Sequence, residues 1–251
     1  MTRFTLITSY YNNPEQLMRQ WENFRGYNEN WSWIIVDDGS QLAPLSTVLS
    51  LKIRGPIPDN ITMYRIEEDI PWNNHGARNL AAYMAPYSWL FMTDMDGILP
   101  AEDANALTGR KVVVNRGSTR LDHLYMDNYY KPIRLEMPDK TLKPPHANTF
   151  LVHRCLHWTV GGYDEDYSGT YGGDHRYELS LQEAINTGHI TLPETRILYY
   201  PRSIYTDSGT NNLERKGSPW HEEYQERRKD KNKFGFEKAT TPLRFTWRKI
   251  G

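Results

Sequence analysis

The sequence lacks the features of a disulfide-stabilised protein and those of a membrane-spanning one. It holds a single cysteine, Cys155, among 251 residues, so neither an internal disulfide nor a multi-cysteine zinc site can form. The apolar run that starts at residue 4 is too short for a signal peptide, and no run of about 18 apolar residues occurs. We therefore expect an intracellular, cytoplasmic protein without a transmembrane segment.

A large net charge is also absent, since the chain carries only -1, but the charge is unevenly distributed. Residues 215–251 hold 11 lysines and arginines against 5 acidic residues, which leaves 19 against 26 for residues 1–214. An acidic body with a basic tail is typical of a chain that contacts a polyanion, such as nucleic acid or anionic lipid. A solvated helix with charges of both signs explains the tail equally well.

Short apolar runs alternate with helical patterns over the first half of the chain, which is typical of a parallel sheet covered by helices. We expect strands at residues 4–8, 33–36, 61–66 and 89–93, and helices at 14–24 and 80–85. Further along we expect strands at 112–114, 149–152 and 197–200, an antiparallel excursion at 121–136 and a helix at 179–186.

Two acidic patterns follow apolar strands of the predicted sheet. The pattern TDMDG places Asp94 and Asp96 two residues apart at a strand end, where two carboxylates can hold Mg²⁺ or Mn²⁺. The pattern VDDGS places Asp37 and Asp38 at the end of an earlier strand, where a carboxylate can accept from a base N–H or a ribose hydroxyl. Both patterns are also ordinary turn sequences.

Two further patterns combine glycines with polar side chains. In WNNHGARN, Arg78 offers a fork of donors near a helix start, which suits a diphosphate or a carboxylate. An asparagine cap followed by a surface arginine gives the same pattern. In GGYDEDYSGTYGGDHRYE, Asp174 precedes a predicted helix, where a general base or a simple N-cap can stand.

In this order and spacing, VDDGS, NNHGARN, DMDG and GGYDEDYSGTYGGDH resemble the motifs of nucleotide-sugar glycosyltransferases of the GT-A fold. The resemblance is to glycosyltransferase family 2 and to the related galactosyltransferase and polypeptide N-acetylgalactosaminyltransferase C-terminal signatures, and it spans residues 4–200. It implies an α/β fold with a Rossmann-like, mixed and mostly parallel sheet flanked by helices. The implied division is a catalytic domain at 1–206, and a flexible lid loop with a basic helical C-terminal extension at 207–251.

The resemblance also implies roles for individual residues. Asp38, together with Asp37, would contact the nucleoside, and Arg78 would lie near the base or the diphosphate. Asp94 would meet both the ribose and the metal, Mn²⁺ or Mg²⁺. Asp96 would bind the metal.

Two assignments stay open. The family has Glu-Asp or Glu-Asn where this chain has Asp174 and His175. We favour Asp174 as the base because the family uses a carboxylate, with His175 as the alternative because imidazole titrates near neutrality. The third metal ligand is expected at Asp207 or His221, since no histidine stands directly after the last predicted strand.

The resulting hypothesis is a metal-dependent, inverting hexosyl- or pentosyltransferase that uses a nucleoside-diphosphate sugar, with UDP as the expected nucleotide. A nucleotidyltransferase of related fold is an alternative, although SYYNNPEQL lacks the usual glycine-rich, lysine-containing loop. A non-catalytic nucleotide-sugar-binding protein is another, because the base motif is altered.

The acceptor also stays open. The basic tail interleaves aromatic residues with lysine and arginine, which suits backbone phosphates and stacked bases. One hypothesis is therefore a bacteriophage enzyme that glycosylates a hydroxymethylated pyrimidine in DNA, in the host cytoplasm. A surface glycan or glycolipid is the more common acceptor in the family, and the tail would then contact anionic headgroups.

Overall fold

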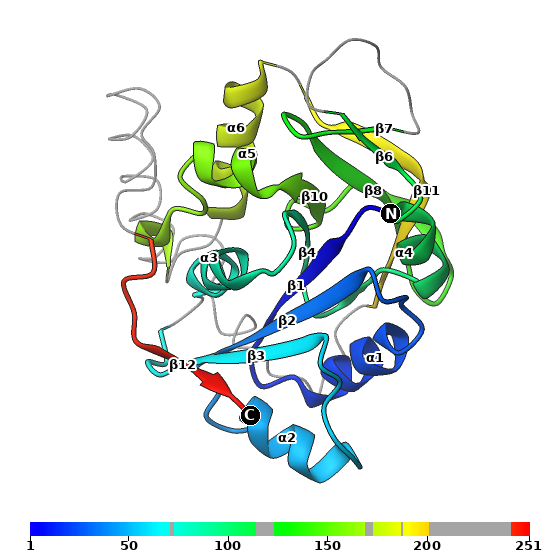
Figure 1. Cartoon of the computed structure of the whole chain (residues 1–251). Coiled ribbons are helices and arrows are strands. Elements are labelled where there is room, and N and C mark those ends of the chain that lie inside the picture. The colour runs from blue at the N-terminus through cyan, green and yellow to red at the C-terminus, as the bar shows by residue number, and fades with distance from the viewer. Residues whose placement is uncertain (71–72, 114–122, 169–172, 187, 201–241) are drawn as a thin grey trace.

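The computed structural model describes residues 1–70, 73–113, 123–168, 173–186, 188–200 and 242–251. Its body is a ten-stranded mixed sheet in the order β12-β3-β2-β1-β4-β10-β8-β11-β5, with β9 paired to β8 (Figure 1). The strands of this sheet are β1 (Phe4–Tyr10), β2 (Trp31–Asp38), β3 (Ile61–Ile66), β4 (Trp89–Thr93), β5 (Gly97–Ile98), β8 (Tyr129–Glu136), β9 (Thr141–Lys143), β10 (Phe150–His153), β11 (Ile190–Tyr199) and β12 (Trp247–Ile250).

The central strands β1 to β4 run parallel to one another, whereas β10, β12, β9 and β5 each pair antiparallel with their neighbours. A separate two-stranded sheet consists of β6 (Lys111–Val113) and β7 (His123–Tyr125). The helices are α1 (Pro14–Phe24), α2 (Leu45–Lys52), α3 (Asn74–Met84), α4 (Ala101–Leu107), α5 (Arg154–Thr159), α6 (Gly173–Ile185) and the short 3₁₀ helix η1 (Glu165–Tyr167).

Helices cover both faces of the sheet, so its inner strands are buried on both sides. Along β2, Trp31, Trp33 and Ile35 pack in one core with α1, α2 and α4, whereas Ile34 and Val36 pack in a second core with α3, α5 and α6. This division follows from the alternation of side chains along a strand. Figure 1 shows the two groups of helices on opposite sides of the sheet. The predicted α/β architecture is thereby confirmed.

Helix α1 begins and ends where the sequence predicts. The Asn13 side chain accepts a hydrogen bond from the Gln16 backbone N–H at 3.2 Å, and a proline occupies the first helical position. Leu17, Trp21 and Phe24 recur at spacings of three and four, and all three are buried in the first core. The strands predicted at 61–66 and 89–93 are likewise confirmed in full.

The described end of the chain differs from the helical extension that the sequence predicts. Residues 247–250 form β12, which pairs antiparallel with the edge strand β3, and Phe245 is buried in the second core. A Cβ atom on Gly76 would lie 2.4 Å from the Phe245 ring, so α3 and this segment pack directly together. These last residues therefore belong to the main domain. The predicted lid loop and most of the basic tail lie outside the described residues, and the division at residue 206 stays a prediction.

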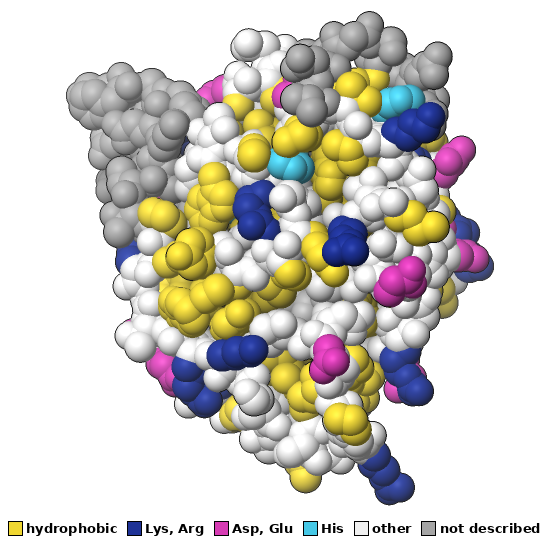
Figure 2. All heavy atoms as spheres, in the orientation of Figure 1, with side chains coloured by type: hydrophobic (Ala, Val, Ile, Leu, Met, Phe, Trp, Pro, Cys, Tyr) yellow, Lys and Arg dark blue, Asp and Glu magenta, His cyan; other side chains and the backbone are white. Residues whose placement is uncertain are grey.

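In the part of the chain that the structure describes, no helix has both the length and the apolar character needed to cross a membrane. Figure 2 shows one face of the molecule, on which lysine and arginine side chains stand singly among hydrophobic and acidic ones.

Candidate functional site

The carboxyl ends of the parallel strands β1, β2 and β4 meet at one edge of the sheet, and helix α3 begins beside them. Asp37 and Asp38 are the last residues of β2, and Asp94 directly follows β4. Because β1 lies between β2 and β4 and runs parallel to both, the two acidic patterns share this edge. This is the place where open parallel sheets bind ligands.

The turn that carries Asp94 and Asp96 is held by its own backbone and by two other elements. The Gly97 N–H donates to the Asp94 carbonyl at 3.0 Å, and the Tyr200 N–H donates to the Asp96 carbonyl at 2.9 Å. The Gln20 side chain of α1 donates to the Gly97 carbonyl at 2.6 Å. The backbone that presents both carboxylates is therefore fixed before any ligand binds.

The Asp94 carboxylate lies between an arginine and a histidine. Its Oδ1 accepts from Arg78 Nη2 at 2.7 Å, and its Oδ2 lies 3.5 Å from His146 Nδ1. The side chain keeps 26% of its surface exposed, so it can still reach a ligand. Burial lowers the pKa of His146, while the charge of Asp94 opposes that shift. His146 is thus expected to be neutral, and it stacks on Tyr199 with 5.9 Å between the ring centroids.

The Asp96 side chain is 6% exposed and lies beside Tyr199. Burial raises the pKa of the Tyr199 hydroxyl, and the charges of Asp96 and Asp94 and a hydrogen bond to Asp96 raise it further. Tyr199 therefore stays protonated and can donate to the carboxylate. Sequence reasoning did not identify His146 or Tyr199, because each comes from a segment without a motif and reaches the site through the fold alone.

Arg78 does not have the exposed position that a direct contact with the donor would need. It is fully buried, and its Nε donates to Asn74 Oδ1 at 3.0 Å. Its Nη1 donates to the Asn148 carbonyl at 2.8 Å and to the Tyr163 hydroxyl at 2.9 Å. Its Nη2 is bonded to Asp94, as described above. These contacts orient Asp94, and the expectation that Arg78 lies near the base or the diphosphate stays a prediction.

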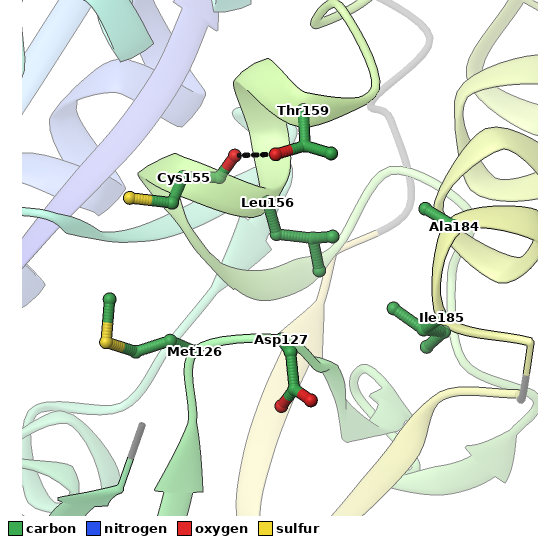
Figure 3. Close-up of a pocket in the computed structure, with 7 residues that line it drawn as sticks. All are labelled: Met126, Asp127, Cys155, Leu156, Thr159, Ala184 and Ile185. Atoms are coloured by element: carbon green, nitrogen blue, oxygen red, sulfur yellow. Dashed lines mark hydrogen bonds between the residues drawn. The ribbon is translucent and has the colours of Figure 1, made fainter. Parts of the chain in front are cut away.

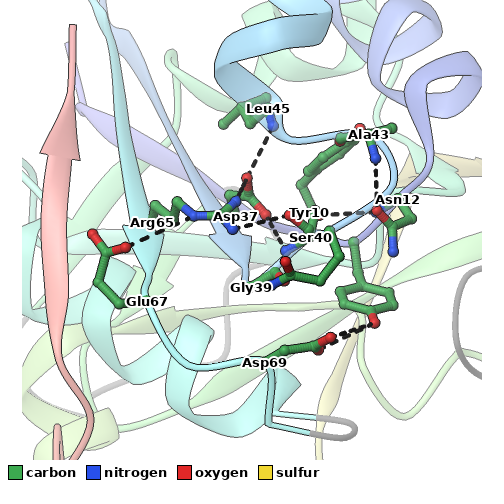
Figure 4. A network of polar contacts seen from close by, with 12 residues as sticks. Tyr10, Asn12, Asp37, Gly39, Ser40, Ala43, Leu45, Arg65, Glu67 and Asp69 are labelled. Atoms are coloured by element: carbon green, nitrogen blue, oxygen red, sulfur yellow. Dashed lines mark hydrogen bonds and ion pairs between the residues drawn. The ribbon is translucent and has the colours of Figure 1, made fainter.

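The Asp37 carboxylate is occupied by groups of the chain itself. Oδ1 accepts from the Ser40 N–H at 2.9 Å, and Oδ2 accepts from the Leu45 N–H at 2.9 Å and from Arg65 at 2.7 Å. Figure 4 shows these contacts as one network that ties the end of β2 to the start of α2. Asp37 is 0% exposed, so its carboxylate supports the turn.

Asp38 has the opposite surroundings. Burial and the charges of Asp37 and Asp69 raise its pKa well above the ordinary value, although a hydrogen bond from the Asn73 backbone opposes the shift. Its Oδ1 is buried and has no hydrogen-bond partner in the described structure. The Nδ2 of Asn73 is likewise buried without an acceptor there. Buried polar atoms are rarely left without partners, so this pair suits a ligand with its own donor and acceptor.

The first turn of α6 distinguishes the two candidates for the base. Asp174 is partly buried, and its charge acts on Arg78, His146 and Tyr163, so it lies within electrostatic reach of the Asp94 site. His175 is exposed. Asp174 is therefore the candidate that the structure brings toward the other site residues.

His75 of α3 sets the distance between α3 and the start of α6. Its ring stacks on Tyr163 with 5.5 Å between centroids, and a Cβ atom on Gly173 would lie 2.3 Å from its Cε1 atom. Burial lowers the pKa of His75 to about 3, and the charge of Arg78 adds to this effect, so the ring is neutral. Glycine at position 173 is needed because the imidazole leaves no room for a side chain.

Asp94 and Asp96 have the donor chemistry for Mg²⁺ or Mn²⁺, which proteins commonly bind through one or two carboxylates together with substrate phosphates and water. No group of three histidine, cysteine or acidic side chains among the described residues is placed to hold a metal ion. Asp207 and His221, the predicted third ligands, lie outside the described residues.

A separate pocket of about 390 Å³ lies between α5, α6 and the turn that leads into β8 (Figure 3). It is lined by Met126, Asp127, Cys155, Leu156, Thr159, Ala184 and Ile185, none of which belongs to the predicted site.

No protein-family model matches the sequence, and a search among proteins of established function finds no relative. The fold matches that of GalNAc-T7 bound to UDP, GalNAc and Mn²⁺, with a TM-score of 0.59, 14% identity and coverage of 80% of this chain and 44% of that chain. TarS 1-349 of S. aureus in complex with UDP matches with a TM-score of 0.52 and 13% identity, over 82% of this chain and 58% of that one.

The mannosyltransferase PcManGT of Pyrobaculum calidifontis, in complex with GDP-Man and Mn²⁺, matches with a TM-score of 0.53 and 18% identity, over 81% of this chain and 58% of that one. The chain thus spans about half the length of the solved structures that it matches.

Proposed function

We propose, on the premise that this chain has the GT-A fold of nucleotide-sugar glycosyltransferases, that it transfers a sugar from a nucleoside diphosphate to an acceptor hydroxyl. The observation that carries the proposal is the Asp94 and Asp96 turn at the end of β4, fixed by the backbone and oriented by buried Arg78. Neighbours of the same fold hold UDP or a GDP-linked sugar, and two of them hold Mn²⁺.

The nucleoside is assigned to the end of β2. Asp38 offers a buried oxygen without a partner among the described residues, which suits the N–H of a base, and Asn73 Nδ2 beside it offers a donor. Asp37 is left out of this role because its carboxylate already accepts three bonds from the chain. UDP is the nucleotide expected first, because uracil presents an imide N–H next to carbonyl acceptors.

The diphosphate is assigned to the end of β4, where Asp94 and Asp96 would hold Mn²⁺ or Mg²⁺. The metal supplies positive charge that stabilises the departing diphosphate. Arg78 holds the Asp94 carboxylate in position from the protein side, so that no rearrangement is needed when charge develops.

The acceptor hydroxyl is assigned to Asp174. In an inverting displacement, the acceptor oxygen forms a bond to the anomeric carbon while the bond from that carbon to the diphosphate oxygen breaks. Asp174 takes the hydroxyl proton, and the electron pair of the broken bond leaves with the diphosphate. The packing of His75 on Gly173 holds the first turn of α6 at the site edge. His175 is exposed and is the weaker candidate.

The test is a panel of nucleotide sugars incubated with the protein and Mn²⁺, with release of nucleoside diphosphate as the readout. Release that depends on Mn²⁺ and is lost in Asp96→Asn supports the proposal, and Asp59→Asn, an exposed residue away from the edge, is the matched control. Release of pyrophosphate from nucleoside triphosphates would indicate a nucleotidyltransferase instead. Tight binding of nucleotide sugars without turnover would indicate a binding protein.

The acceptor stays open between hydroxymethylated DNA and a surface glycan or glycolipid. The basic tail that motivates the DNA hypothesis lies almost entirely outside the described residues. Retention on duplex DNA that weakens steeply with salt would support a nucleic-acid acceptor, because phosphate contacts release counterions. Indifference of the protein to DNA would leave a glycan or glycolipid.

A further inference from the structure

Arg134 of β8 lies near the Asp94 and Asp96 turn and has no carboxylate partner among the described residues. Its guanidinium carbon lies 4.1 Å from the centroid of the Tyr199 ring, so the cation lies over the aromatic face. Its Nε is buried and has no hydrogen-bond partner, and the guanidinium makes no ion pair with any described residue. A partly buried charge of this kind is unusual, because buried charges are normally paired.

Other arginines at the same sheet edge show the usual arrangement. Arg78 is bonded to Asp94 at 2.7 Å, and Arg65 is bonded to Asp37 at 2.7 Å. The nearest acid on the same strand, Glu136, is paired with Lys143 at 3.2 Å. Arg134 is therefore not paired with a carboxylate of its own strand or of the facing strand β9. Its guanidinium N–H groups remain available to a ligand.

The position of Arg134 links it to both acidic residues of the turn. Tyr199, on which it stacks, is hydrogen-bonded to Asp96 and stacks on His146, which lies 3.5 Å from Asp94. Burial lowers the pKa of His146, and the charge of Arg134 lowers it further. Arg134 thus lies within electrostatic reach of the site from the β8 and β11 side, whereas Arg78 approaches Asp94 from α3.

We propose that Arg134 binds phosphate oxygens of the ligand held at Asp94 and Asp96. This inference rests on the proposed function and adds to it a phosphate ligand from the second half of the sheet. A guanidinium stacked on an aromatic ring presents its N–H donors in a fixed plane, which matches the oxygens of a phosphate in a two-bond contact. The charges of Asp94 and Asp96 act on the same Tyr199 as Arg134, and they make a bare anion unfavourable there, so the phosphate binds together with a divalent cation.

The chemistry leaves two sources for the phosphate. The first is the diphosphate of the sugar donor, on which Arg134 would stabilise the charge that develops as the bond to the sugar breaks. The second is a phosphate carried by the acceptor. Both use the same contact, and ligands that contain or lack each phosphate distinguish them.

The experiment measures binding by calorimetry in the presence of Mn²⁺ for the wild type, Arg134→Ala and Arg134→Lys. The ligands are UDP, uridine and pyrophosphate, and inorganic phosphate is titrated into the UDP-loaded protein. Loss of the contact is expected to weaken UDP binding about tenfold to a hundredfold, as for a hydrogen bond to a charged group, and to leave uridine binding unchanged. Arg134→Lys keeps the charge but loses the planar fork, so it should recover part of the affinity. Arg25→Ala is the control, because its side chain is 69% exposed.

Each binding result tests either the phosphate contact of Arg134 or the proposed function. If UDP affinity is unchanged but the affinity for inorganic phosphate at the UDP-loaded protein falls, Arg134 serves an acceptor phosphate. If both Arg134 variants bind UDP, pyrophosphate and inorganic phosphate as the wild type does, the inference is wrong, whereas the proposed function stands. If the wild type binds no nucleotide, the proposed function fails, and the pyrophosphate comparison still tests Arg134. Should Arg134→Ala unfold, Arg134→Lys carries the comparison with wild type.

Discussion

The two acidic turns at the sheet edge look alike in sequence and differ in what surrounds them. Asp37 and Asp38 are adjacent on β2, so their side chains point to opposite faces of the sheet. Asp37 faces α2 and Arg65, where three bonds fill its carboxylate, and Asp38 faces Asn73 at the start of α3 with one oxygen left without a protein partner among the described residues. One acid of this pair is structural and the other is available.

The second turn keeps both of its carboxylates at the site. Asp94 and Asp96 are two residues apart in a turn whose backbone is fixed by three hydrogen bonds. Asp94 is oriented by Arg78, and Asp96 lies beside Tyr199. Both acids of the second turn can therefore contact one ligand, whereas only one acid of the first turn can. Substitutions in the two turns test this difference.

The largest effect is expected on the reaction rate when Asp96 is replaced. Asp96→Asn should lower the rate of nucleoside diphosphate release about a hundredfold to a thousandfold, because one preorganised electrostatic contact to the developing charge is removed. Mn²⁺ binding, followed by electron paramagnetic resonance of the free ion, should weaken in the same variant. A variant that keeps both the rate and the Mn²⁺ affinity would contradict the metal assignment. Asp59→Asn should behave as the wild type.

The next largest effect is expected on the stability of the fold when Asp37 is replaced. Its pairing with Arg65 is buried, with side-chain exposures of 0% and 12%. Asp37→Ala removes the 2.7 Å partner of Arg65, which keeps only Glu67 at 4.0 Å, and leaves two backbone N–H groups without their acceptor, so it should lower the free energy of unfolding by about 3 kcal/mol. Urea unfolding measures this. If nucleotide affinity falls strongly in Asp37→Asn while unfolding is unchanged, the separation of roles between Asp37 and Asp38 is wrong.

A smaller effect is expected for Asp38. Asp38→Asn should weaken UDP binding about tenfold to a hundredfold, since it replaces one acceptor oxygen of a buried group with a donor or a weaker acceptor. The thermal midpoint should stay the same or rise, because a buried carboxyl group with a raised pKa is removed. Calorimetric titration with UDP and thermal unfolding together separate this pattern from a general loss of structure.

The smallest effect is the pH dependence of stability. The pKa of Asp38 is raised in the folded state, so its contribution to stability is complete below its ordinary value of 3.8 and is lost as the pH rises through the folded-state value. The difference in unfolding free energy between the wild type and Asp38→Asn should therefore shift against the wild type as the pH is raised above about 4. A difference that stays constant across this range would show that Asp38 is not held in a desolvated state.

Much of the fold could be predicted because the signals are local. Apolar runs bounded by turns located β1, β3 and β4, and the cap and three-and-four spacing located α1. Helix α2 was missed because its start depends on a bond from the Leu45 N–H to Asp37. Strand β12 was missed because its residues, WRKI with two basic side chains, become a strand through pairing with the edge of β3.

The site was predicted in part for the same reason. The positions of Asp38, Asp94 and Asp96 at strand ends follow from local pattern, and the structure places them at one edge. Arg78 was predicted either to lie near the base or the diphosphate or to be a surface residue, and the structure buries it against Asn148 and Tyr163. Arg134 carried no local signal, because its only described stacking partner, Tyr199, lies on another strand.

By itself, the sequence determined that carboxylates stand where buried strands end, because the change from apolar run to polar turn is written in consecutive residues. Only the tertiary structure decided which of these carboxylates is free to meet a ligand. That choice depends on cations and hydroxyls from other strands and helices, such as Arg65, Arg78 and Tyr199, and burial makes each such contact strong enough to fix the role of the acid beside it.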